Sequence, residues 1–166
     1  MTFELPASRR AFLTRTSVTL IGMTALMAGC STVGVLTPTP GATDQTEAAL
    51  PMVNKLRAAR GLPALSLNLP ARKAAAEQAV RMAKAEKMTH LIGFNDSFLK
   101  RMKGRDVPLP AAENISSGQA SVEAAVQAWI DSPKHLENML GAYKGLGVAV
   151  SRTSAGRTYW GMVLSG

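Results

Sequence analysis

Beyond about residue 45, apolar side chains recur at helical spacing in segments that begin at a cap or a proline and end near a glycine. Asn68 and Ser121 are predicted N-caps, and Ser132 followed by Pro133 predicts a further helix start. The predicted helices cover residues 46–60, 71–88, 97–102, 122–129 and 133–140.

The C-terminal part of the chain has a different pattern. Short apolar runs at 146–151 and 158–164 predict two strands of a hairpin that covers the helices. Residues 111–118 are small and polar, and we expect a turn there. Trp129 and Trp160 each lie in an apolar periodic segment and are predicted core residues. The pattern predicts a layered α/β domain.

The first 29 residues have the three-part layout of a secretory signal: a charged head, an apolar stretch, and a small-residue site before Cys30. The apolar stretch, residues 17–28, is too short and too diluted by Thr and Gly for a comfortable membrane span. Ser8-Arg9-Arg10-Ala11-Phe12-Leu13 resembles a twin-arginine signal. We therefore expect Arg9 and Arg10 to direct export.

The sequence Leu26-Met27-Ala28-Gly29-Cys30 resembles a bacterial lipobox, which implies that Cys30 is acylated and becomes the new N-terminus. Cys30 is the only cysteine, so no disulfide can form within the chain. Residues 30–44 are rich in Thr, Pro and Gly and predict a flexible tether. The expected organisation is a signal at 1–29, the lipidated tether, and one domain at 45–166.

The distribution of charge along the chain bears on one class of partner, nucleic acids. The chain of 166 residues has a formal net charge of +8, and its only dense basic cluster is Lys100, Arg101, Lys103 and Arg105. No aromatic residues alternate with these cations to stack bases, so we expect no nucleic-acid partner. The cluster is predicted to be the solvated end of a helix.

Four sequence blocks occur in order after residue 111. They are Ala112-Glu113-Asn114-Ile115 with Gly118, Trp129 to His135 with Asn138-Met139-Leu140, Leu146-Gly147-Val148-Ala149, and Tyr159-Trp160. This order resembles bacterial domains of the CAP superfamily, which contains the cysteine-rich secretory, antigen 5 and pathogenesis-related proteins. The resemblance covers about residues 45–166 and implies an α/β fold, a three-layer α-β-α sandwich.

The resemblance also implies a central cleft lined by histidine and acidic residues. The positions that match it are His90, Glu113 and His135, and Asp131 is a weaker candidate for a fourth, acidic position. Two imidazoles and one carboxylate suit a divalent metal such as zinc or magnesium, with water completing the coordination. The same three side chains could instead form a hydrogen-bonded network that organises loops, and the sequence leaves both interpretations open.

Two supporting residues come from the same blocks: Asn114, a predicted turn organiser, and Ser132, a predicted cap. A hydrolase remains an alternative, in which Glu113 and a cleft histidine activate water. Ser116 and Ser117 are close in sequence, but no nucleophile-elbow pattern surrounds them.

The leading hypothesis is an exported lipoprotein, held at a membrane of the bacterial periplasm or cell envelope by lipid on Cys30. Its domain would serve as a binding or scaffold module for a metal, a small molecule or a lipid. Lipid binding is implied only by the resemblance.

Overall fold

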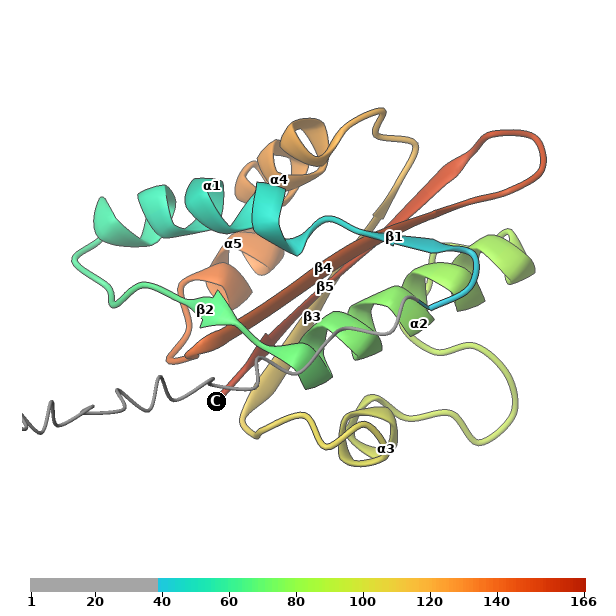
Figure 1. Ribbon diagram of the computed structural model, residues 1–166, viewed down its shortest axis with the longest axis horizontal. Helices are drawn as coiled ribbons and strands as arrows, with labels where there is room; N and C mark the ends of the chain where they lie inside the picture. The colour runs from blue at the N-terminus through green and yellow to red at the C-terminus, as the bar shows by residue number, and fades with distance from the viewer. Residues whose placement is uncertain (1–38) are drawn as a thin grey trace, which may run out of the picture. The chain divides into compact units, whose positions relative to one another are not determined.

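The computed structural model describes residues 39–166, in which one mixed sheet separates two groups of helices (Figure 1). The strands follow the order β1-β4-β5-β3, and β2 pairs with β4 beside β1. The elements are β1 (Ala42–Asp44), α1 (Thr46–Ala58), β2 (Ser66–Leu67), α2 (Leu69–Ala85), α3 (Phe98–Lys103), β3 (Ala111–Ser117), α4 (Val122–Ile130), α5 (Pro133–Met139), β4 (Gly145–Arg152) and β5 (Thr158–Ser165).

Alternation along the strands separates two cores. In β4, Leu146, Val148 and Val150 pack with α1, α4 and α5, whereas Ala149 packs with α2 and α3. Successive side chains of a strand point to opposite faces, so the sheet is covered on both sides. The result is the predicted α-β-α sandwich, with α1, α4 and α5 on one face and α2 on the other (Figure 1).

The predicted helix starts are confirmed. The side chain of Asn68 accepts a hydrogen bond from the Ala71 N–H, and that of Ser121 accepts one from the Ala124 N–H. Ser132 is the N-cap of α5 with Pro133 after it, although its side chain makes no capping hydrogen bond. Trp129 and Trp160 are buried, as predicted.

The prediction of a turn at 111–118 was wrong, because residues 111–117 form β3. This strand pairs with β5 over its whole length, from Ala111 opposite Ser165 to Ser117 opposite Tyr159. The polar residues Glu113 and Asn114 interrupt the apolar pattern expected of a buried strand. They can be buried because both faces of β3 are covered by elements that supply their hydrogen-bond partners.

The folded part also begins earlier than predicted. Residues 42–44, assigned to the tether, form β1 and pair with β4. Asp44 explains why, because its carboxylate accepts hydrogen bonds from Thr46 and pairs with Arg72 of α2. The short segment is therefore fixed at both the sheet and the helices.

Residues 39–166 contain all five strands of the sheet and both cores, so this part of the chain can fold on its own. Within it, no helix combines the length and the apolar character that crossing a membrane requires.

Candidate functional site

Glu113 lies in the middle of β3 on the face covered by α2 and α3, and its side chain is only 2% exposed. Arg101 of α3 grips this carboxylate with both ends of its guanidinium: Nη1 lies 2.9 Å from Oε2 and Nη2 lies 3.1 Å from Oε1. A bidentate pair of this kind is among the stronger charge-assisted contacts in proteins. The negative charge of Glu113 is thus neutralised inside the chain.

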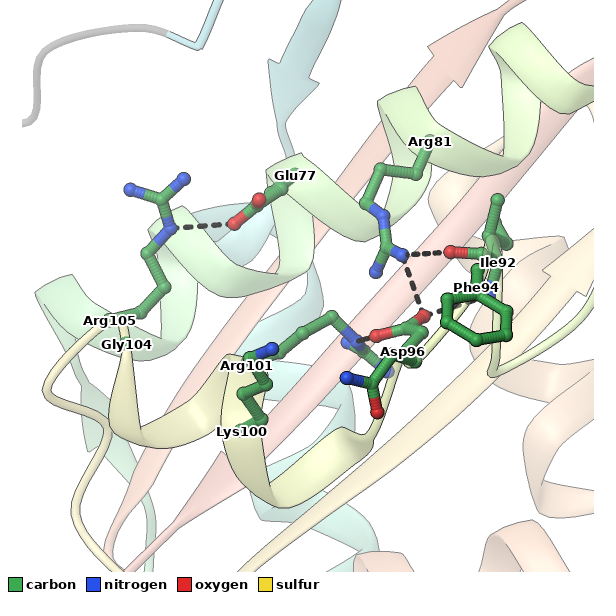
Figure 2. A pocket seen from close by; sticks show the side chains of 10 residues that line it. Glu77, Arg81, Ile92, Phe94, Asp96, Lys100, Arg101, Gly104 and Arg105 are labelled. Atoms are coloured by element: carbon green, nitrogen blue, oxygen red, sulfur yellow. Dashed lines mark hydrogen bonds and ion pairs between the residues drawn. The ribbon is translucent and has the colours of Figure 1, made fainter.

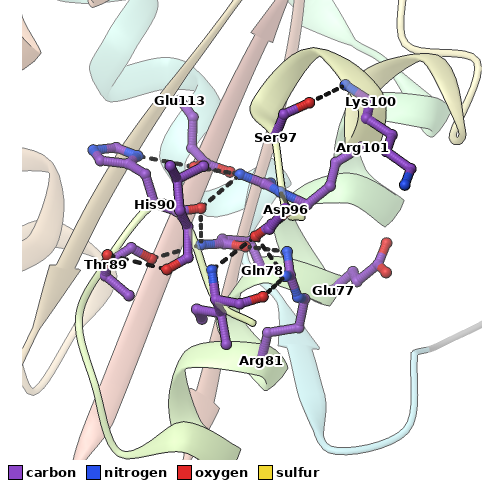
Figure 3. A network of polar contacts seen from close by, with 12 residues as sticks. Glu77, Gln78, Arg81, Thr89, His90, Asp96, Ser97, Lys100, Arg101 and Glu113 are labelled. Carbon is purple, nitrogen blue, oxygen red and sulfur yellow. Dashed lines mark hydrogen bonds and ion pairs between the residues drawn. The ribbon is translucent and has the colours of Figure 1, made fainter. Parts of the chain in front are cut away.

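His90 meets the same carboxylate from the loop between α2 and α3. Its Nδ1 lies 2.9 Å from Oε1 of Glu113, and its ring is about half exposed. An ionised carboxylate only accepts hydrogen bonds, so Nδ1 of His90 donates the hydrogen bond to Oε1 of Glu113, and Nε2 makes no hydrogen bond to the described residues. Figure 3 shows this arrangement from close by.

The loop that carries His90 is held by its backbone as well. Gln78, fully buried on α2, donates to the carbonyl oxygens of Thr89 and His90, and Arg101 also donates to the His90 carbonyl. Three hydrogen bonds from two side chains to two adjacent carbonyls fix the position of the histidine without using its ring (Figure 3).

Asp96 is the second carboxylate of this network. Its Oδ1 lies 3.3 Å from Nε of Arg101, and its Oδ2 accepts hydrogen bonds from Arg81 and from the Ile92 N–H. Burial alone would raise the pKa of Asp96, but the Ile92 hydrogen bond and the nearby guanidinium groups outweigh it and hold the pKa below its usual value. We call His90, Asp96, Arg101 and Glu113 the guanidinium network.

The pKa of Arg101 is shifted upward, opposite to that of Asp96. Burial alone would lower the pKa of Arg101, but the hydrogen bond and charge of Glu113, with the charge of Asp96, raise it. The guanidinium therefore remains a fixed positive charge between two buried carboxylates.

Asn114 and His135 belong to the opposite side of the sheet. Asn114 follows Glu113 in β3, so its side chain points to the other face, where it donates to the His135 carbonyl and accepts from Asn138. These bonds fix α5 against the edge strand. Asn114 organises a helix on the sheet and not the turn that the sequence predicted.

His135 is half-buried in the first turn of α5. Burial lowers the pKa of His135, and the charge of His90 lowers it further. The ring is therefore neutral near pH 7. No direct contact joins the His135 ring to Glu113 or His90 among the hydrogen bonds of the described residues.

The remaining predicted residues lie apart. Asp131 is exposed at the end of α4, where its carboxylate accepts a hydrogen bond from Gln127. Ser132 occupies the N-cap position of α5, but its side chain makes no capping hydrogen bond. Cys30, Arg9 and Arg10 lie outside the described residues.

The side chains that the sequence suggested for a zinc or magnesium ion do not fit one in this arrangement. Both oxygens of Glu113 already face the positive guanidinium of Arg101, which stands where a cation would approach. Within residues 39–166, no three or more His, Cys, Asp or Glu side chains come close enough to hold a metal ion. The hydrogen-bonded network accounts for the geometry better.

Arg101 and Asp96 were missed by the sequence analysis, which counted Arg101 in a solvated basic cluster. A signal was present, because Phe98, Arg101 and Met102 follow the i, i+3, i+4 spacing of one helix face. Met102 is fully buried, so its neighbour on that face points inward as well.

The layers and the network together define a class of protein: an α-β-α sandwich with a histidine and glutamate pair at the edge of its sheet. The model of the family described as "Cysteine-rich secretory protein family" (CAP) matches residues 50–164. The chain belongs to this family.

Solved structures from bacteria share the fold. An outer surface protein from Borrelia burgdorferi superposes with a TM-score of 0.65 at 21% identity, over 75% of this chain and 96% of that one. An extracellular SCP-domain protein from Bacillus anthracis gives a TM-score of 0.64 at 21% identity, over 73% of this chain and 40% of that one.

A cysteine-rich secretory protein from Staphylococcus aureus is more distant, with a TM-score of 0.55 and 16% identity, over 73% of this chain and 38% of that one. A search of curated proteins found no match. The similar proteins are thus bacterial surface or extracellular proteins by their descriptions, and the likeness to them concerns the fold.

Proposed function

We propose that the protein is an exported, membrane-tethered binding module of the bacterial cell envelope. Arg9 and Arg10 direct export by the twin-arginine route, and acyl chains on Cys30 hold the mature chain at a membrane. The proposal is supported by the lipobox-like sequence before Cys30 and by the surface or extracellular descriptions of the similar structures.

The observation that carries a binding role is the bidentate hold of Arg101 on Glu113. Both oxygens of this carboxylate are already paired and neither is free to accept a proton from a bound water, so the network is better suited to presenting groups than to turning over a substrate. The groups presented are Nε2 of His90, which belongs to the network, and the half-buried ring of His135, which lies on the other side of the sheet edge. Imidazole nitrogens of this kind suit a small polar ligand that donates hydrogen bonds to them or accepts hydrogen bonds from them.

The binding site can be tested by NMR, because the chain has only two histidines and both belong to the proposed site. The imidazole resonances are followed while a soluble peptidoglycan fragment, a fatty acid, zinc chloride or magnesium chloride is added. We expect one of the organic probes to shift His90 in the wild type, and Glu113→Gln to reduce the shift. Asp131→Asn is the matched control. Unchanged resonances with all organic probes would contradict the binding role.

The anchor is tested in cells by labelling with radioactive palmitate. We expect label in the wild type and none in Cys30→Ala, and we expect Arg9→Lys with Arg10→Lys to leave the protein unexported. Label that persists in Cys30→Ala, or export that survives the double change, would contradict the corresponding part of the proposal.

One observation favours a hydrolase as the second candidate. The carboxylate of Glu113 orients Nδ1 of His90 and leaves Nε2 free to take a proton from water, as a general base does. Neither Ser116 nor Ser117 has a hydrogen bond to a histidine within residues 39–166, so water would be the nucleophile. Turnover of peptidoglycan that His90→Gln abolishes would support this candidate.

A further inference from the structure

The loop from α2 to α3 exposes an unusual share of the large apolar side chains. Six large hydrophobic side chains are exposed in the described residues: Met88, Leu91 and Phe94 lie in this loop, and Leu99 follows in the first turn of α3. Phe94 makes essentially no contact, with a relative exposure of 103%. Apolar groups concentrated in one surface segment indicate an interaction site more than isolated ones do.

Unpaired cations flank the same loop. Lys87 precedes it, and Lys100 and Lys103 lie on α3 after it, all three exposed. None of them pairs with a carboxylate among the ion pairs of residues 39–166, whereas Arg101 nearby is locked inside. The basic cluster at 100–105 therefore divides into a buried guanidinium and a set of free surface charges.

An open pocket of about 530 Å³ lies between α2, α3 and this loop (Figure 2). Phe94 stands on one side of it, and Lys100 and Arg105 line it. Arg105 contacts Glu77 through Nε alone, which leaves both of its terminal nitrogens for another acceptor. The pocket thus combines free cationic donors with an exposed ring beside them.

The described chain begins close to the start of this loop. Pro40 and Gly41 line a second pocket together with Val80, Ala83 and Lys84 near the C-terminal end of α2, and the loop starts just after that helix. Eight residues lie between Cys30 and Thr39, and the nine chain steps that join the two span at most about 30 Å even when fully extended. A domain of this size has a diameter of about 35 Å.

We propose that this loop surface, made up of Met88, Leu91, Phe94, Leu99, Lys87, Lys100, Lys103 and Arg105, docks on the anionic face of the membrane that holds the chain. Phe94 and its apolar neighbours enter the boundary between headgroups and acyl chains, and Lys100 and Arg105 contact headgroup phosphates. This rests on the proposed function in one respect, the lipid on Cys30, which keeps the domain within its own diameter of the bilayer.

The combination of charges and apolar groups favours a lipid surface. Peripheral membrane sites combine Lys or Arg with Phe or Leu, since electrostatic attraction to anionic lipids adds to apolar burial. The loop surface would add to the hold of the acyl chains and would fix which face of the domain points away from the membrane.

The test measures flotation of the mature chain, residues 30–166, with lipid vesicles. The chain carries Cys30→Ser, so no acyl chain contributes and failure of the anchor cannot affect the result. We expect binding to vesicles that contain phosphatidylglycerol, little binding to pure phosphatidylcholine, and release at high salt. Phe94→Ser should weaken the partition coefficient about tenfold or more. Lys100→Gln should weaken it about fivefold at low salt.

Two matched variants control for general loss of apolar surface or charge. Leu67→Ser removes an exposed side chain on β2, and Lys55→Gln removes an exposed charge on α1; both should bind like the wild type. Phe94 touches nothing, so its replacement leaves the melting temperature unchanged. Absence of binding to the anionic vesicles, or equal losses in the control and loop variants, overturns the proposal. Palmitate labelling of Cys30 tests the anchor separately.

Discussion

At the scale of single residues, Arg101 determines the character of the site. Its guanidinium lies between the buried carboxylates of Glu113 and Asp96, with only 11% of its side chain exposed. Two buried negative charges without this cation would each face a large desolvation cost. The arginine is therefore both a structural centre and the reason why a divalent cation does not fit.

We expect Arg101→Met to lower the free energy of unfolding by about 3 kcal/mol, because it removes the bidentate partner of the buried Glu113 and leaves Asp96 with Arg81 as its only guanidinium partner. Arg105→Met is the matched control, since its pair with Glu77 is exposed and should contribute less than about 1 kcal/mol. Urea unfolding of both variants checks the prediction. Equal losses would mean that Arg101 is no more important than a surface residue.

The effect of metal ions on the melting temperature gives a second test of the role of Arg101. We expect zinc or magnesium to leave the melting temperature of the wild type unchanged, because the guanidinium of Arg101 already occupies the cationic position beside Glu113. A metal-dependent rise in melting temperature that His90→Ala removes would contradict this interpretation of the site.

His135 gives the protein a pH dependence. Burial lowers the pKa of His135, and the charge of His90 adds to this, from an ordinary value of 6.5. The unfolded chain therefore takes up a proton first as the pH falls below that value, and stability present above it is lost as the pH falls through the lower folded pKa.

We expect the wild type to lose unfolding free energy below pH 6.5, and His135→Gln to lose less over the same interval. Urea unfolding at several pH values checks this. If the free energy of unfolding falls equally with pH in the two proteins, another group causes the loss of stability below pH 6.5.

The residues of the site were only partly predictable from the sequence. His90, Glu113 and His135 could be selected because they fall in ordered family blocks, and His90 and Glu113 do meet. His135 lies on the other side of the sheet edge, which no spacing along the chain could indicate. Arg101 was missed because charge counting treats every arginine as solvated.

At the scale of elements, the close approach of α2 to the sheet depends on small residues on both sides. A Cβ on Gly147 of β4 would overlap backbone atoms of Ala71 and Arg72, and one on Gly161 of β5 would lie 2.9 Å from the Ala75 carbonyl oxygen. The alanines that the sequence assigned to a closely packed helix therefore meet glycines of the strands.

We expect Gly147→Ala to destabilise the domain by about 3 kcal/mol or to prevent folding, because helix backbone cannot move aside without separating the layers. Gly104→Ala at the end of α3 is the control and should change stability by less than about 1 kcal/mol. Thermal and urea unfolding measure both. A Gly147→Ala protein as stable as the control would mean that the layers have room to adjust.

Elements with regular patterns were predictable, and those stabilised by distant partners were not. The β4–β5 hairpin and the caps of α2 and α4 follow from local signals. β3 looked like a turn because the polar groups of Glu113 and Asn114 find partners from distant elements. Leu99 is exposed although it is apolar, because α3 is short and turns Met102 toward the core.

At the scale of the whole molecule, β1 joins the three layers near the start of the described residues. Its backbone pairs with β4, and the Asp44 carboxylate contacts both α1, through Thr46, and α2, through Arg72. The hydroxyl of Thr46 in turn bonds to the backbone of Val148 in the sheet. The segment predicted to be tether is thus part of what holds the sandwich closed.

A chain that begins at Gln45 should therefore be less stable than one that begins at Thr39, by about 3 kcal/mol, since it loses the hydrogen bonds from Thr46 to Asp44, the ion pair with Arg72 and the strand pairing together. Asp44→Ala in the longer chain should account for about 2 kcal/mol of this loss. Glu47→Ala, which removes a 76% exposed partner of Arg72, should cost almost nothing. If the two chain lengths unfold at the same urea concentration, the tether does extend to Asp44 and β1 does not help to hold the domain together.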